Sequence, residues 1–190
     1  MIIVVASITA ILTVPLTGRS LAPLARLALC RVWMVWLSIG LQFVITLVPN
    51  FPNWLGQPVH IFTFALSAVF LWSNRRLPGA FLVGLGAALN LAAIAANSGT
   101  MPASMWAWKT AGFPTLTGQF ENSNVVNNAR LAWLGDVFAV PKGWPFANVF
   151  SLGDVIIVIA VGYLAHTWCR RAEVAVPSES GAARLLATAD

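Results

Sequence analysis

Two aspartates near the C-terminal end of the chain stand in almost the same short string. Asp136 lies in WLGDV at residues 133–137, and Asp154 lies in SLGDV at residues 151–155. Two carboxylates that share a site cannot both ionise cheaply, so one keeps its proton while the other activates water, as in aspartyl peptidases. The glycine before each aspartate lets the backbone approach its neighbours closely. The two strings therefore predict a catalytic pair, if they meet in the fold.

Several polar side chains near these aspartates are candidates for supporting groups. They are Asn124, Asn127, Asn148 and Ser151. Asp154 is the most informative residue, because it falls about one and a half turns inside an apolar run, where a carboxylate costs about 2.5 to 3.5 kcal/mol. A structural role is the alternative: one aspartate caps a surface helix, and the other caps the last helix or hydrogen-bonds across the bundle.

The stretch from Asn124 to Asp154 resembles the C-terminal third of the aspartyl lipoprotein signal peptidases. The matching strings are residues 124–127, LGDVF at 134–138, WPFAN at 144–148 and SLGD at 151–154. This chain departs from the family's pattern at Asn127, where that family has an aspartate, and at Ser151, where it has an asparagine. The resemblance implies a membrane-embedded peptidase whose catalytic aspartates match Asp136 and Asp154.

The elements that would position these residues are apolar helices. The chain of 190 residues is 58% hydrophobic and 9% charged, with a mean hydropathy of +0.79, outside the range of soluble domains. A bilayer core needs roughly 20 apolar residues per helix, and fewer where it thins. We expect an all-α integral membrane protein with about five transmembrane helices, at residues 2–16, 32–48, 59–72, 77–96 and 149–168.

The segments between and after the apolar runs define the predicted domain organisation. Residues 1–171 are predicted to form a single membrane domain, and residues 172–190 a flexible cytoplasmic tail. The first run lacks a basic start and a cleavage site, so we expect it to be retained. The external segment, residues 97–148, is expected to fold back on the membrane surface, with short helices or a hairpin around residues 113–120 and 129–134.

Basic residues predict the orientation of these helices. They concentrate after the first, third and fifth runs, as Arg19, Arg26, Arg31, Arg75, Arg76, Arg170 and Arg171. Because cytoplasmic loops are rich in arginine and lysine, the N-terminus is predicted to be external and the C-terminus cytoplasmic, in a bacterial inner (cytoplasmic) membrane. Cys30 and Cys169 each precede an arginine, so both should face the reducing cytoplasm, and no disulfide is expected.

The whole chain is also similar to an uncharacterised family of bacterial multi-pass membrane proteins. The shared features are an arginine-rich first loop, the NRRLPG turn at residues 74–79 and the NVFSLGD string at residues 148–154. This resemblance supports the topology and implies no activity. Asn90 and Asn97 share a face of the fourth helix, where interhelical hydrogen bonding accounts for them.

Composition and motifs narrow the classes of ligand. The basic residues form no patch with interleaved aromatic residues, so no nucleic-acid partner is expected. The sequence has no Cys/His cluster for zinc, and no metal site is predicted. The cofactor stays unknown, because apolar helices can bind quinones and pigments by packing alone.

Two functions of different classes remain open, so whether the chain is an enzyme is undecided. The first is a non-catalytic accessory or assembly subunit of a larger membrane complex, whose partners are the lipid bilayer and other membrane subunits. Small size and few intramembrane polar groups favour it. The alternative is a membrane-embedded, aspartyl peptidase-like hydrolase that uses Asp136 and Asp154 at the external face. A transporter is less favoured, because the sequence shows no internal repeat.

Overall fold

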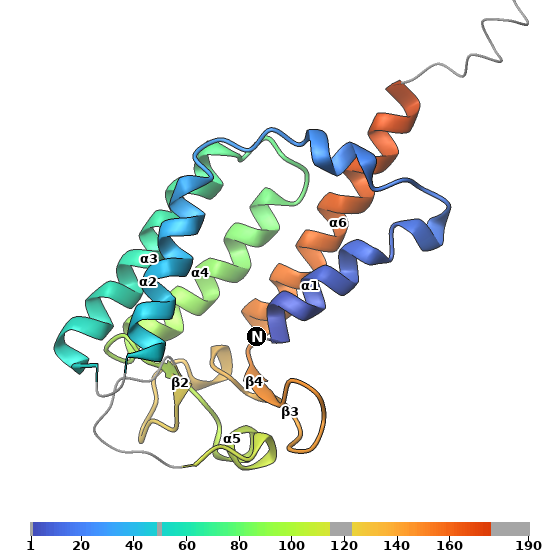
Figure 1. The fold of residues 1–190 in the computed structure, drawn as a ribbon. Coiled ribbons are helices and arrows are strands. Elements are labelled where there is room, and N and C mark those ends of the chain that lie inside the picture. The colour runs from blue at the N-terminus through green and yellow to red at the C-terminus, as the bar shows by residue number, and fades with distance from the viewer. Residues whose placement is uncertain (1, 49–50, 115–122, 176–190) are drawn as a thin grey trace, which may run out of the picture.

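A computed structural model describes residues 2–48, 51–114 and 123–175 of the chain. In this part, each of the five apolar runs forms a helix (Figure 1). The helices are α1 (Ile2–Leu12), α2 (Trp33–Leu47), α3 (Asn53–Ser73), α4 (Ala80–Ala96) and α6 (Leu152–Ala175). Each predicted span therefore contains a helix, and the largest differences are at α3, which starts six residues before the predicted start, and at α6, which ends seven residues after the predicted end.

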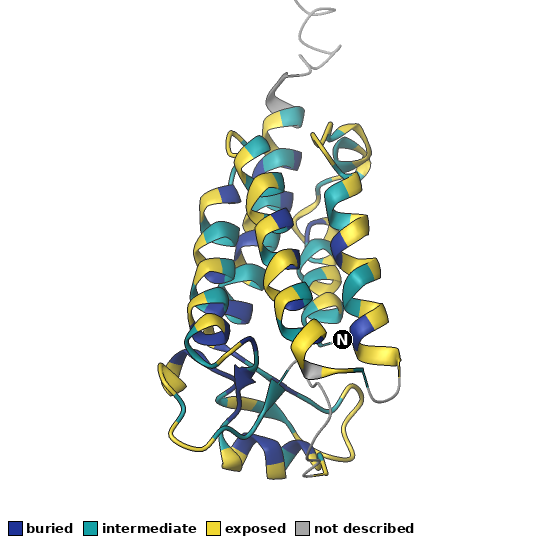
Figure 2. Cartoon of the chain, turned by 90° about the vertical axis from the view of Figure 1, so that its left-hand side faces the viewer, coloured by how far each residue is buried: buried dark blue, intermediate teal, exposed yellow. Residues whose placement is uncertain are grey.

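Two of these helices are long and apolar enough to cross a membrane. They are α3, over Trp54–Ser73, and α6, over Leu152–Ala172, whereas α1, α2 and α4 are apolar but shorter. Large apolar side chains are exposed, among them Trp36 at 69% and Phe81 at 79%. Figure 2 shows exposed positions along the helices. The described part is thus mostly helical with two candidate membrane-crossing helices, and five crossings stay a prediction.

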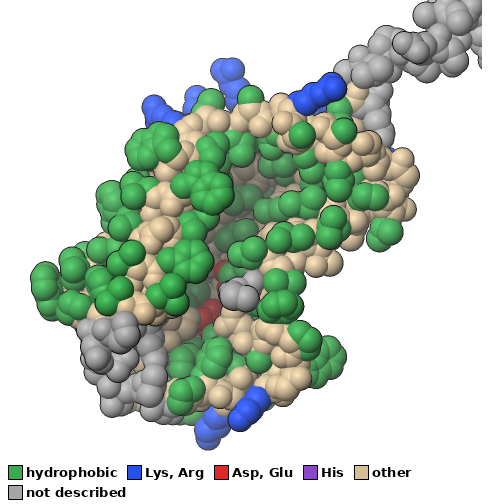
Figure 3. All heavy atoms as spheres, viewed as in Figure 1, with side chains coloured by type: hydrophobic (Ala, Val, Ile, Leu, Met, Phe, Trp, Pro, Cys, Tyr) green, Lys and Arg blue, Asp and Glu red, His purple; other side chains and the backbone are tan. Residues whose placement is uncertain are grey.

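Helices α4 and α6 form the centre of the bundle. Helix α4 packs against α6 and α3, helix α1 packs against α6, and helix α2 packs against α3. Figure 1 accordingly shows α2 and α3 on one side and α1 and α6 on the other. In the space-filling view a hollow opens between these two sides, with acidic side chains visible at its lower end (Figure 3).

Short strands and one short helix, α5 (Met105–Ala111), cover one end of the bundle (Figure 1). Strand β1 (Met101–Pro102) pairs in parallel with β2 (Ser123–Asn124), and β3 (Phe138–Val140) pairs antiparallel with β4 (Asn148–Phe150). A short 3-10 helix, η3 (Ala132–Leu134), lies in one of the two regions where short structure was expected. The other region, 113–120, lies mostly outside the described residues. Among the described residues, β3 and β4 form a hairpin, outside both regions where short structure was expected.

The helix ends differ from prediction for local reasons. Helix α6 begins at Leu152, three residues after the predicted start, because residues 148–150 pair with β3. Helix α3 begins at Asn53, before the predicted start, and contains Pro58 inside the helix, where the missing N–H of proline removes one helical hydrogen bond. Helix α6 continues to Ala175, and the remainder of the predicted flexible tail, 176–190, lies outside the described residues.

Candidate active site

Asp154 and Ser151 form a reciprocal cap at the start of α6. The Ser151 Oγ accepts a hydrogen bond from the Asp154 backbone N–H over 3.1 Å, and the Ser151 N–H donates to the Asp154 Oδ2 over 2.9 Å. This is a capping box, in which two side chains satisfy two otherwise unpaired N–H groups. The structural alternative predicted for Asp154, a cap near the N-terminus of the last helix, therefore describes its local geometry.

Asn90 joins this cap from the neighbouring helix α4. Its Nδ2 donates to the Asp154 Oδ1 over 2.7 Å, and its Oδ1 accepts from the Ser151 Oγ over 2.8 Å. All three residues are buried. The interhelical hydrogen bonding expected of Asn90 is confirmed, and it links α4 directly to the carboxylate on α6.

Two glycines allow the two helices to come this close. A Cβ atom at Gly86 would lie 2.5 Å from the Gly153 carbonyl oxygen and 2.8 Å from the Ile157 side chain. A Cβ atom at Gly153 would collide with the Asn90 side chain. The glycine that precedes Asp154 is thus required for the approach of α4 to α6.

Asp136 is held by the strands at the end of the bundle. Its backbone N–H donates to the Pro102 carbonyl over 2.8 Å, and its carbonyl accepts from the Ser104 N–H over 3.0 Å. On the other side of β1, the Ser123 hydroxyl donates to the Asp136 Oδ2. Asp136 is only 4% exposed. A Cβ atom at Gly135 would collide with the Pro102 carbonyl, so the glycine before this aspartate also permits close backbone contact.

The β3–β4 hairpin brings the two LGD strings together. Phe138 pairs with Phe150, so Asp136 lies just before one strand and Asp154 just after the other, at the same end of the hairpin. Burial raises the pKa of Asp136 from 3.8 to about 7, the Ser123 hydrogen bond opposes the rise, and the charge of Asp154 adds to it. The charge of Asp154 is the smallest of these three contributions, and a catalytic pair of the two carboxyl groups stays a prediction.

An apolar cavity lies beside Asp154, between α1 and α6. Its volume is about 330 Å³, and its walls include Ile2 and Ala6 of α1, Val155 of α6, and Phe150 of the hairpin. Asp154 is one of the lining residues, through its apolar atoms, because its carboxylate oxygens accept hydrogen bonds from Asn90 and Ser151. An apolar group that entered the cavity would therefore lie beside Asp154.

The other predicted supporting residues are placed differently. Asn124 is in β2, and its Oδ1 accepts from the Val125 N–H over 2.7 Å. Asn148 is in β4, and its Oδ1 accepts from the Val149 N–H over 3.0 Å. Asn127 is exposed in a turn. Of the four, Ser151 alone has a described hydrogen bond to either carboxylate.

Two residues that contact the carboxylates were not predicted to belong to the site. Asn90 is a lone amide side chain in an apolar helix, and such a residue indicates a hydrogen bond to another helix. The sequence does not indicate which helix that is. Ser123 reaches Asp136 through the parallel pairing of β1 with β2, and no short-range pattern predicts that pairing.

The described side chains form no group of three or more His, Cys, Asp and Glu residues that could hold a metal ion. His60 contacts the Gly99 carbonyl through Nδ1 at 3.0 Å, and His166 contacts the Thr13 hydroxyl through Nε2 at 2.9 Å. These histidines therefore link separate helices to other parts of the fold and do not share a site.

Comparison with known proteins gives a family without an assigned activity. A family model described as "Family of unknown function (DUF5317)" matches residues 26–165, a range that includes Asn90, Asp136 and Asp154. An uncharacterised protein of Thermotoga maritima is 30% identical over 123 residues, which cover 64% of this chain and 68% of that protein. No solved structure matches the chain.

Proposed function

This chain belongs to the DUF5317 family of unknown function, and we propose that it is a membrane-embedded hydrolase of the aspartyl peptidase type. The observation that carries the proposal is the position of Asp136 and Asp154 at the same end of the β3–β4 hairpin, where the charge of Asp154 contributes to the raised pKa of Asp136. Asp136 is buried with a pKa raised to about 7, and Asp154 accepts hydrogen bonds from Asn90 and Ser151. When two neighbouring carboxyl groups have different surroundings, their pKa values differ, and one can act as an acid while the other acts as a base.

The pair gives each carboxyl group a role. Asp136, protonated up to about pH 7, donates its proton to the oxygen of the scissile carbonyl group. Asp154 accepts a proton from water while the hydroxide part of that water bonds to the carbonyl carbon. Collapse of the tetrahedral intermediate then breaks the C–N bond, the proton on Asp154 passes to the leaving amine, and one hydroxyl proton of the intermediate returns to Asp136. Asn90 and Ser151 act as positioning residues, because they fix the orientation of Asp154.

The surroundings of the pair favour an apolar membrane peptide as the substrate. The cavity beside Asp154 is lined by aliphatic and aromatic side chains of α1, α6 and the hairpin. A peptide bond at the end of an apolar segment would reach the carboxylates while that segment stays among the helices. The reaction would take place at the external face of the membrane, where the strand layer lies in the proposed orientation.

We propose the predicted orientation for the membrane, with the strand layer external and the C-terminal end of α6 cytoplasmic in a bacterial inner membrane. Asn74 at the end of α3 hydrogen-bonds to Cys30 before α2, and Trp168 of α6 hydrogen-bonds to Pro23, so these connections lie at the end away from the strand layer. Figure 3 shows several basic side chains at that end and fewer at the end with the strand layer. This distribution supports a cytoplasmic position for it.

The test is cleavage of a fluorogenic apolar peptide by the purified protein in lipid nanodiscs. Asp136→Asn and Asp154→Asn should each lower kcat by about 100-fold or more, as expected for loss of a proton-transfer group. Arg75→Gln is the control, because Arg75 lies at the opposite end and contacts Trp72. Folding of each variant is monitored by circular dichroism. Full activity in both folded aspartate variants would exclude this function.

The second candidate is a non-catalytic accessory or assembly subunit. One observation favours it: the capping box and the Asn90 bond account for the position of Asp154 without any reaction. The hollow between α1 and α2 would then receive a helix of a partner subunit (Figure 3). Chemical cross-linking in native membranes tests this candidate, and recovery of the monomer alone would contradict it.

A further inference from the structure

The end of the molecule opposite the carboxylates contains a second cavity, with a different lining. Its volume is about 660 Å³, and it lies between the 3-10 helix η2 (Ala22–Arg26) and the last turns of α6. The lining residues are Ser20, Ala22, Pro23, Arg26, Trp168, Arg171 and Ala172. The cavity therefore combines two guanidinium groups with apolar walls and includes no acidic side chain.

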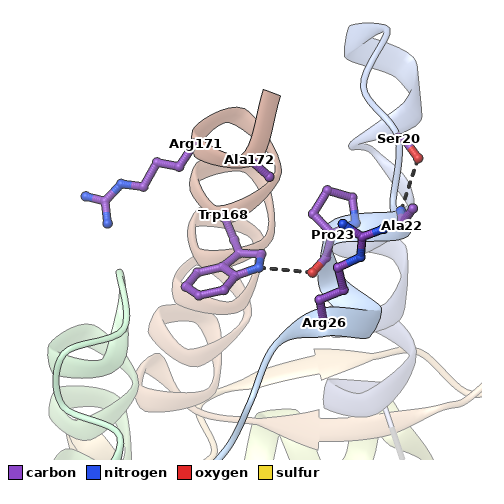
Figure 4. A pocket seen from close by; sticks show the side chains of 7 residues that line it. All are labelled: Ser20, Ala22, Pro23, Arg26, Trp168, Arg171 and Ala172. Carbon is purple, nitrogen blue, oxygen red and sulfur yellow. Dashed lines mark hydrogen bonds between the residues drawn. The ribbon is translucent and has the colours of Figure 1, made fainter. Parts of the chain in front are cut away.

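The walls of this cavity are fixed to each other. The Trp168 indole N–H donates to the Pro23 carbonyl over 3.0 Å, which ties α6 to η2 (Figure 4). Nearby, Val14, Ala165 and Cys169 form a buried apolar cluster against which Leu21 and Leu24 pack. Buried apolar contacts and the Trp168–Pro23 hydrogen bond thus hold η2 and α6, the two walls of the cavity, in place.

The charges of the cavity are available to a ligand. No described acidic side chain lies within salt-bridge distance of Arg26 or Arg171. In Figure 4, Arg26 lies beside Pro23 on η2, whereas the Arg171 side chain extends from α6 away from Pro23 and Trp168, so the two basic side chains lie on opposite sides of the indole ring. Both arginines are exposed. Guanidinium groups bind phosphate oxygens through paired N–H donors, so the cavity matches a phosphate-bearing anion.

We infer that this cavity binds the headgroup of an anionic phospholipid. Trp168 and Arg171 stand at the end of the candidate span Leu152–Ala172, where a tryptophan ring and a basic side chain meet the membrane–water boundary. Arg26 would bind the phosphate beside Pro23, and the exposed Arg171 side chain would turn toward it from α6. Pro23, Ala172 and the face of Trp168 would contact the glycerol and the first part of the acyl chains. Basic pockets between membrane segments on the cytoplasmic side are suited to such lipids.

The experiment is native mass spectrometry of the full-length protein in detergent, titrated with phosphatidylglycerol, with phosphatidylcholine or with inorganic phosphate. We expect phosphatidylglycerol to bind more tightly than phosphatidylcholine. Arg26→Gln and Arg171→Gln should each weaken phosphatidylglycerol binding about fivefold, and the double variant about 20-fold. Arg75→Gln is the matched control, since it removes an arginine of the same end outside the cavity.

Three results would overturn the inference. The first is equal binding of phosphatidylglycerol by the wild type and the double variant. The second is an equal loss in Arg75→Gln, which would indicate a general effect of charge. The third is binding of inorganic phosphate as tight as that of the lipid and equally sensitive to the two substitutions, which would make the cavity a site for soluble anions. Trp168→Phe keeps an aromatic ring and removes the bond to Pro23, and it should weaken lipid binding with little change in fold.

Discussion

The amide of Asn90 on α4 donates a hydrogen bond to the carboxylate of Asp154 on α6 over 2.7 Å. The same amide accepts from Ser151, so one side chain serves both members of the α6 cap. The three groups satisfy one another in a buried position between apolar helices. Such a network fixes the rotation and depth of one helix relative to the other, because a shift would leave buried polar groups unpaired.

Removal of the Asn90 amide should destabilise the protein. Asn90→Ala keeps the reciprocal cap but leaves the Asp154 Oδ1 without its donor and the Ser151 hydroxyl without its acceptor, and an unpaired buried polar group costs about 1 to 3 kcal/mol. The free energy of unfolding in detergent micelles, measured by titration with denaturant, should fall by at least that amount. Thr9→Val is the control, because Thr9 is exposed and bonds within its own helix. Equal stability of the two variants would contradict a structural role for the network.

A methyl group at the crossing of α4 and α6 should separate the two helices. Gly86→Ala places a Cβ atom 2.5 Å from the Gly153 carbonyl oxygen, and overpacking of this kind costs roughly 1 to 3 kcal/mol. Gly40→Ala on α2 meets nothing within 4 Å and should stabilise its helix by about 0.5 to 1 kcal/mol. Opposite shifts in melting temperature are therefore expected. A similar, small change in both variants would show that the crossing is loose.

Stability should depend on pH through Asp136. The pKa of this carboxyl group is about 7 in the folded protein and 3.8 in its ordinary state, so the unfolded chain releases the proton first. The free energy of unfolding should therefore fall as pH rises from about 4 to about 7, by up to about 4 kcal/mol, and the loss should level off above that range.

Asp136→Asn provides the comparison for this pH dependence. The amide cannot ionise, so the slope of stability between pH 4 and 7 should be smaller than in the wild type. Unfolding is followed by tryptophan fluorescence at each pH. Parallel curves for the two proteins would mean that Asp136 titrates normally.

Ser123 should tune the same carboxyl group. Its hydroxyl donates to Asp136 and lowers the pKa that burial raises, so Ser123→Ala should move the pKa of Asp136 above about 7. Carbon-13 NMR of labelled aspartate would measure the shift. If the hydrolase proposal holds, the alkaline fall in kcat should move to higher pH in the same variant. A pKa that moves downward would contradict this role of the hydroxyl group.

Much of the fold follows from local sequence. The five apolar runs predict the five long helices, because continuous apolar segments of that length have few other ways to satisfy their backbone in lipid. The ends were less predictable: residues 148–150 look like the start of the last helix, but pairing with β3 makes them a strand. The candidate pair Asp136 and Asp154 was identified from the repeated LGD string, whereas the roles expected of Asn124, Asn127 and Asn148 were not supported by described contacts with either carboxylate.

The sequence by itself determined the chemical types available: few charges, two aspartates each preceded by glycine, and a lone asparagine in an apolar helix. Tertiary structure decided which of these types meet. Asn90 and Asp154 are 64 positions apart, and Ser123 reaches Asp136 across β1, so both contacts depend on helix crossing and strand pairing. Local patterns constrain each segment's conformation, but the distances between segments arise only when their surfaces pack and their buried polar groups find partners.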